Sequence, residues 1–126
     1  MKLIAETETA MGVAFPLGMK VRMSRSNGGE ITVDGEAWWL YPFRDPTDRR
    51  TISRTAEDIR RETEYALAEI AGFPEDGVAI AHNGAGDRLV LRREGSRLRD
   101  EVWLFRMHED ECEIVCEQVE DLWNET

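Results

Sequence analysis

Residues 78–93, VAIAHNGAGDRLVLRR, constrain the fold of this chain more than any other stretch. Two runs of strand-forming apolar residues flank the sequence NGAGD at 83–87. Glycine permits positive φ, asparagine tolerates the left-handed region, and aspartate can bond the backbone two residues on, so this composition predicts the turn of a β-hairpin. In both runs the apolar residues are consecutive, which predicts strands covered on both faces. The hairpin should therefore lie in the interior of a small sheet.

The length of the chain favours one domain over residues 1–126, because 126 residues can bury roughly two thirds of their unfolded surface around a single core. No apolar run approaches the roughly 18 residues that a membrane helix needs. Acids stand in MKLIAETETA where a signal peptide would have its apolar segment. These features predict a cytoplasmic protein.

Charge is the most informative feature of the composition, since 26 acids against 16 bases give a net charge of −10. Residues 107–126 contain eight acids and no Lys or Arg. An acidic end of this kind argues against nucleic acid or an anionic membrane as a partner, because both would be repelled. It would attract a basic protein. The alternative is that the charge only keeps a small domain soluble.

Local patterns divide the rest of the chain into helices and short strands. The expected elements are a helix at 2–11, a short helix from Leu17 to the stop at Asn27-Gly28-Gly29, a hairpin of 30–33 and 36–43, a polar linker at 44–54, a helix capped by Thr55 and ending near Gly72, the central hairpin, strands at 101–107 and 112–115, and a closing helix at 116–123. Strands in runs predict an α+β fold, with helices packed on an antiparallel sheet of about six strands.

Trp38 and Trp39 lie on the second strand of the hairpin that Asp34-Gly35 is expected to close. Neighbouring side chains on a strand point to opposite faces. One tryptophan should therefore be in the core, and the other should lie under a helix or be exposed at an interface.

Residues that would indicate catalysis or metal binding are absent or poorly placed. The histidines have no zinc-type spacing, the serines lie in no G-x-S-x-G context, and neither cysteine has a basic neighbour in sequence. A distant metal set of His82, Asp87 and His108 and an anion site in the arginine-rich stretch from Arg44 to Arg61 remain alternatives. We expect no enzyme activity, no metal and no cofactor.

The order of the motifs resembles the SUKH superfamily, the Smi/Knr-like proteins. The leading helix is followed by a Gly-x-x-Phe-Pro step at 12–16, and the strand Ile80-Ala81 leads into the central turn. A strand with an aromatic residue, a His-acid turn at 108–110 and a final helix complete the similarity. Two departures stand after the turn, where Arg88-Leu89 replaces the usual aromatic residue and no Asp closes the strand. The structural signature turn of this resemblance comprises Asn83, Gly84, Gly86 and Asp87.

The resemblance implies a SUKH-like domain that binds other proteins, since bacterial members are commonly immunity proteins that neutralise toxins, often nucleases. A basic toxin domain would fit the acidic charge of the chain. The residues that we expect at the contact are Glu109, Asp110, Glu111 and Glu113, with Trp39 or Trp123 as an aromatic anchor. Two alternatives remain, a regulatory scaffold like the eukaryotic members, and a small anion-binding or ligand-binding domain with a pocket of Arg49, Arg50 and His82.

Overall fold

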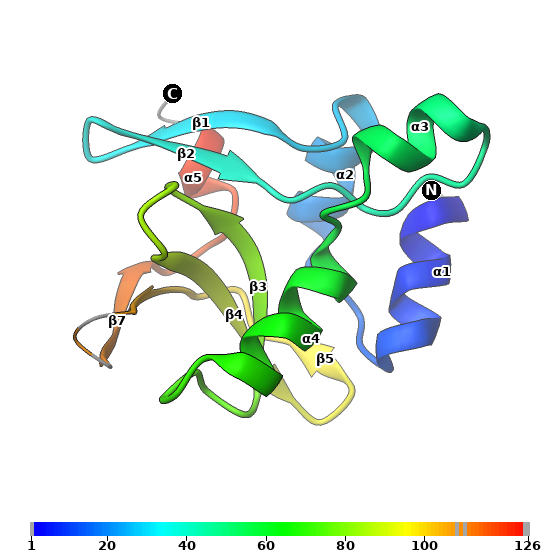
Figure 1. The fold of residues 1–126 in the computed structure, drawn as a ribbon. Helices are drawn as coiled ribbons and strands as arrows, with labels where there is room; N and C mark the ends of the chain where they lie inside the picture. The colour runs from blue at the N-terminus through cyan, green and yellow to red at the C-terminus, as the bar shows by residue number, and fades with distance from the viewer. Residues whose placement is uncertain (1, 108, 110, 125–126) are drawn as a thin grey trace.

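Among the residues that the structure describes, seven strands form one curled antiparallel sheet, with helices packed against it (Figure 1). The structure is a computed structural model, and it describes residues 2–107, 109 and 111–124. The helices are α1 (Lys2–Met11), α2 (Leu17–Arg25), α3 (Arg49–Arg54), α4 (Ile59–Glu69) and α5 (Asp121–Asn124). The strands are β1 (Gly29–Val33), β2 (Glu36–Leu40), β3 (Gly77–His82), β4 (Arg88–Glu94), β5 (Arg97–Leu98), β6 (Val102–Arg106) and β7 (Glu111–Cys116).

The predicted central hairpin, β3 and β4, occupies the middle of the sheet. Neighbouring strands follow the order β1-β2-β3-β4-β6-β7, and the short β5 pairs with the end of β4 outside this order. Ala79, Ile80 and Ala81 of β3 have no exposed surface, and the same holds for the Leu-Val-Leu run of β4. The expectation of strands covered on both faces is confirmed, and so is the α+β class with an antiparallel sheet.

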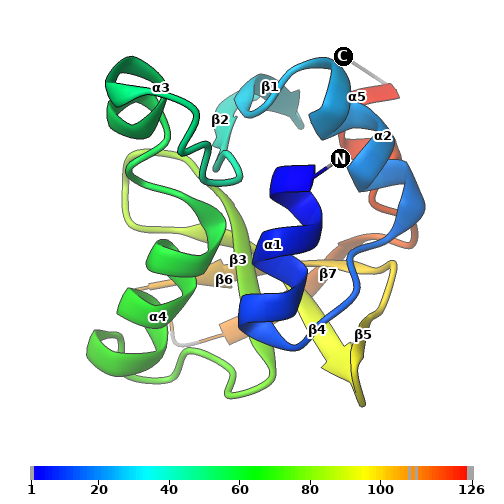
Figure 2. The same ribbon diagram turned by 90° about the vertical axis from the view of Figure 1, so that its right-hand side faces the viewer.

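Helix α4 covers β3 and is bonded to it directly. The register between β3 and β4 shifts at Ala79, where a bulge disturbs the ladder. The backbone N–H of Ala79 donates to Thr63 Oγ1 on α4 at 3.0 Å in a buried hydrogen bond. Helices α1 and α4 lie side by side (Figure 2), and residues of both line the same pockets.

Helix α3 interrupts the segment that was expected to be a polar linker. The Asp48 carboxylate accepts from the Thr51 backbone N–H at 2.9 Å, and the Thr51 hydroxyl accepts from the Asp48 N–H at 3.1 Å. This reciprocal capping box stabilises a helix that has no buried residue. The prediction that Thr55 caps the next helix is wrong, because Thr55 ends α3 and Asp58 caps α4 by accepting from the Arg61 N–H at 2.9 Å.

The C-terminal helix is shorter than predicted. Only residues 121–124 are helical, and Cys116 belongs to β7 and not to a helix. None of the helices in the described part of the chain is both long enough and apolar enough to cross a membrane.

The adjacent tryptophans of β2 point to opposite faces, as predicted. Trp38 is 3% exposed and belongs to the core, whereas Trp39 is 40% exposed. Aromatic contacts complete the core, with Phe15 packed edge-on against Phe43 at a centroid distance of 5.0 Å. Of the two outcomes expected for the second tryptophan, exposure is the one observed, and its role at an interface stays a prediction.

Asn27 fastens the end of α2 to the chain beyond β2, and its replacement tests this link. Its amide nitrogen donates to the Phe43 carbonyl and its amide oxygen accepts from the Phe43 N–H, both at 2.8 Å. Asn27→Ala leaves both backbone groups unpaired and should lower the free energy of unfolding by about 2–3 kcal/mol in urea denaturation. The control Ser24→Ala, at an exposed site of α2, should change it by less than about 0.5 kcal/mol. Equal effects of the two variants would contradict this role of Asn27.

Candidate partner-binding surface

Three β-hairpins turn at the same end of the sheet (Figure 1). We call this region, around Glu36, Asn83, Asp87 and Met107, the hairpin end. Asn83 Nδ2 donates to Glu36 Oε1 at 3.0 Å and links the first turn to the second. Asp87 Oδ1 accepts from the backbone N–H of Met107 at 3.2 Å and links the second turn to the third. The three turns therefore form one connected surface.

The central turn of this surface is held by its own side chains. Asn83 Oδ1 accepts from the Ala85 N–H at 2.9 Å, and Asn83 Nδ2 donates to Asp87 Oδ2 at 3.1 Å. Gly86 has a φ of +96°, so another residue there would be strained, and its Cβ would displace the flexible end of the Met107 side chain, 2.8 Å away. The turn contains all the residues of the signature expected from the sequence, which are Asn83, Gly84, Gly86 and Asp87.

An aromatic stack connects the hairpin end to the core. The His82 ring stacks on Trp39 at a centroid distance of 5.7 Å and on Tyr41 at 5.1 Å. Trp39 and His82 are direct partners across β2 and β3. Since Tyr41 is only 4% exposed, the exposed indole of Trp39 is supported from behind by a buried residue.

A buried polar cluster lies beside the stack. Burial raises the pKa of Tyr41 to about 12, although the neighbouring Arg88 guanidinium opposes this rise. Burial also raises the pKa of Glu62, and the nearby Glu57 carboxylate adds to this effect. Arg88 is 9% exposed, its Nη1 donates to the Gly86 carbonyl at 2.7 Å, and its buried Nε has no hydrogen-bond partner. Tyr41 and Arg88 are thus largely removed from water, and Glu62 is partly buried.

A groove of about 340 Å³ runs between the C-terminal part of α4 and the hairpin end. Its lining residues are Tyr65, Glu69, Ile70, Ala71, Gly86, Arg88 and Met107. Sequence reasoning did not select Tyr65, Arg88 or Met107 for the site. One available signal was Tyr65, an aromatic residue on the polar face of the predicted helix, which is 52% exposed in the structure.

The acids expected at the contact lie in and after the third turn. Glu109 and Glu113 are exposed, and the Arg106 guanidinium lies 3.9 Å from a carboxylate oxygen of each. This arginine, just before the acidic segment in sequence, compensates part of their charge. The predicted contact residue Asp110 lies outside the described residues, as does His108. Glu111 begins β7.

The two candidate tryptophans are in different environments. Trp39 belongs to the hairpin end through its stack on His82. Trp123 lies on α5, is partly buried and packs against the core, and α5 contacts β1. The structure therefore joins Trp39, but not Trp123, to the surface formed by the turns.

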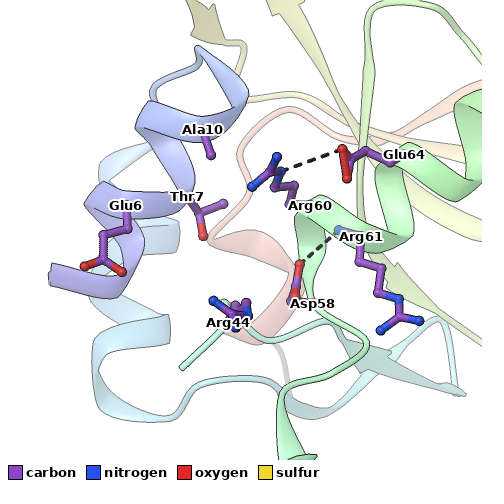
Figure 3. Close-up of a pocket in the computed structure, with 8 residues that line it drawn as sticks. All are labelled: Glu6, Thr7, Ala10, Arg44, Asp58, Arg60, Arg61 and Glu64. Carbon is purple, nitrogen blue, oxygen red and sulfur yellow. Dashed lines mark hydrogen bonds and ion pairs between the residues drawn. The ribbon is translucent and has the colours of Figure 1, made fainter. Parts of the chain in front are cut away.

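A second pocket, of about 280 Å³, lies between α1 and the start of α4 (Figure 3). It is lined by Glu6, Thr7, Ala10, Arg44, Asp58, Arg60, Arg61 and Glu64. Three carboxylates offset three guanidinium groups, and Arg60 Nε lies 3.7 Å from Glu64 Oε2. Arg49 and Arg50, which were expected to help bind an anion, lie exposed on α3. The charge balance of this pocket gives no preference for an anion.

No group of three or more His, Cys, Asp or Glu side chains in the described part of the chain is arranged to hold a metal ion. Of the metal set considered from the sequence, His82 is in the aromatic stack and Asp87 bonds the backbone of Met107. The observed roles of these two side chains are structural.

The raised pKa of Tyr41 predicts a pH dependence of stability. Because the pKa is 10.0 in the unfolded chain and about 12 in the native state, the contribution of Tyr41 is complete below pH 10 and is lost as the pH rises towards 12. Between about pH 9 and about pH 11, the free energy of unfolding in urea should fall less steeply for Tyr41→Phe than for the wild type. The exposed Tyr65→Phe should keep the wild-type slope. A wild-type slope for Tyr41→Phe would contradict the prediction.

The comparison with known protein families agrees with this architecture. The model of the SMI1 / KNR4 family (SUKH-1) matches residues 2–125, which include every described helix and strand. No curated protein matches the chain, and no solved structure does. The similarity noted in the sequence is confirmed over essentially the whole chain, which belongs to the SMI1 / KNR4 (SUKH-1) family.

Proposed function

We propose that this protein is an immunity protein, a non-catalytic domain that binds a cognate toxin and blocks its activity. Membership of the SUKH-1 family supports this function, because bacterial proteins that resemble it are commonly of this kind. The net charge of −10 favours a basic partner. A nuclease domain fits this requirement, since it must itself attract an anionic substrate.

The exposed side chain of Trp39 is the main support for a binding role. A tryptophan that is 40% exposed and stacked on His82, whose ring in turn stacks on the buried Tyr41, is held in place, so it loses little conformational freedom when a partner covers it. Tryptophan is also among the residues that contribute most to binding energy at interfaces. Trp39 would therefore act as the central anchor of the contact.

Exposed acids lie elsewhere at the hairpin end and along the third hairpin, and they would attract a basic partner to this end of the sheet. Glu36 and Glu69 are exposed at the hairpin end and in the adjoining groove. Glu109 and Glu113 extend the acidic surface along the third hairpin, with Arg106 as a local counter-charge. Charges at the rim of an interface act mainly on the rate of association. An exposed aromatic residue and exposed acids at the same end of the sheet suit a partner that presents both an apolar patch and Lys or Arg side chains.

Truncation of Trp39 tests the anchor. The tagged protein is co-purified from its host, grown with and without competitors, and the protein that stays bound is identified. Trp39→Ala should weaken binding of that partner at least about tenfold in a calorimetric titration. Leu17→Ala, which removes a side chain 73% exposed on α2, should leave the affinity unchanged. Equal affinities for wild type and Trp39→Ala would remove Trp39 from the contact, and a partner without toxic activity would favour a regulatory scaffold.

Charge reversal tests the acidic rim. The double variant Glu109→Lys and Glu113→Lys should lower the association rate about tenfold or more at low salt, and the difference should shrink at high salt. The control double variant Glu6→Lys and Glu75→Lys changes the net charge equally at exposed sites on α1 and before β3. If both double variants slow association to the same extent, net charge and not this surface governs the encounter.

A further inference from the structure

Arg88 is a buried cation without an ionic partner. It is 9% exposed, and among the described residues no carboxylate lies within 4.0 Å of its guanidinium group. Its partners across the sheet are His82 and Phe105, neither of which is an acid. Removal of a charge from water without a compensating charge destabilises a folded protein. A buried polar group without a partner in a native structure calls for an explanation, and a bound ion is one of them.

The hydrogen bonds of Arg88 use only part of its capacity. A guanidinium group has five N–H donors in a fixed plane. Nη1 donates to the Gly86 carbonyl at 2.7 Å, and the guanidinium group lies close enough to Tyr41 to affect its pKa. The buried Nε donates to no acceptor. Arg88 therefore supports the central turn and still has donors to spare.

Glu62, which interacts electrostatically with Arg88, does not act as its counter-ion. Glu62 feels the charge of Arg88, but burial dominates and the pKa of Glu62 is raised. A carboxylate paired directly with an arginine would have its pKa lowered. Glu69, at the groove, is exposed to water. The positive charge of Arg88 is thus left without a matched negative charge.

The groove beside α4 gives access to this arginine. Arg88 lines the groove together with Tyr65, Ile70 and Met107, whose side chains are largely apolar. These apolar side chains would cover a short hydrocarbon stem, whereas the exposed Glu69 lies at the same groove. A carboxylate has two coplanar oxygens and matches the donor pairs of a guanidinium group better than a spherical anion does.

We propose that this groove is a carboxylate-binding site, with Arg88 as the residue that binds the anion. Its occupant in the complex is an Asp or Glu side chain of the protein partner. The site itself is independent of the proposed function, whereas its occupation by a toxin residue rests on that function. The acidic hairpin end would then receive one partner acid among the partner's basic residues, which adds specificity to an otherwise charge-driven contact.

A titration with sodium acetate tests the site in the protein alone. Ionic strength is held constant with sodium chloride, and the ¹H–¹⁵N resonance of the Arg88 Nε–H is followed by NMR. We expect a shift that saturates below about 100 mM acetate, together with a rise of about 2 °C in the thermal midpoint. Arg88→Met should abolish the thermal response, and Arg61→Met, an exposed arginine of the same region, should retain it. No saturable shift in the wild type would overturn the site, and a response to phosphate but not to acetate would overturn its assignment to carboxylates.

A second measurement tests the occupant. With the co-purified partner in hand, Arg88→Met should lower its affinity at least about tenfold, and added acetate should compete with the partner for the wild type only. If acetate binds but Arg88→Met keeps full affinity for the partner, the partner does not supply the carboxylate. Because the acetate titration needs no partner, failure of the proposed function and failure of the site are distinguishable.

Discussion

The burial of β3 and β4 on both faces is the constraint on which the rest of the structure depends. The apolar runs 79–81 and 89–91 of these strands have no exposed surface and must be covered from either side, and a chain of this length has few elements for the task. Helix α4 supplies part of the cover through Ile59, Thr63 and Ala66, and Phe73 packs edge-on against Phe105 at a centroid distance of 5.4 Å. The bulge at Ala79 shows how closely helix and strand are joined, because a backbone donor of the strand is satisfied by the helix.

The same burial determines the chemistry of the hairpin end. Near the turn between β3 and β4, polar side chains lie against the buried core and are shielded from water. Tyr41 and Arg88 are buried there and Glu62 is partly buried. Burial raises the pKa values of Tyr41 and Glu62. The side chains of Asn83 and Asp87 in the turn itself form hydrogen bonds that hold the three hairpins relative to one another. Hydrogen bonds therefore fix the turns of the hairpin end, whereas the positive charge of Arg88 has no ion-pair partner there among the described residues.

The sequence predicted correctly those parts of the fold that depend on residues close to one another in the chain. The NGAGD turn, the consecutive apolar runs beside it and the opposed tryptophans of β2 all follow from rules that span a few residues. It missed α3, because Asp48 and Thr51 are as typical of loops as of a capping box. It also placed Thr55 where Asp58 acts, since both residues are good caps one turn apart.

Most of the candidate surface depends on contacts distant in sequence. Trp39 and the acids of the third hairpin were selected from the sequence, but nothing local places them on one end of the sheet. Tyr65 and Met107 become neighbours only because α4 lies across that end. Arginine is normally exposed, so the burial of Arg88 was unexpected. Its position two residues before Val90, on the same face of a strand predicted to be fully covered, was the signal that could have revealed it.

The two outer strands of the sheet give the acidic composition a further consequence. Strand β1 carries the exposed Glu30 and strand β7 the exposed Glu113, so both edge strands of the sheet carry negative charge. When two copies approach edge to edge, like charges meet before any ladder can form. A foreign strand rich in lysine would meet no such barrier. The same carboxylates would thus disfavour edge pairing between two copies of the chain and favour pairing with a basic strand.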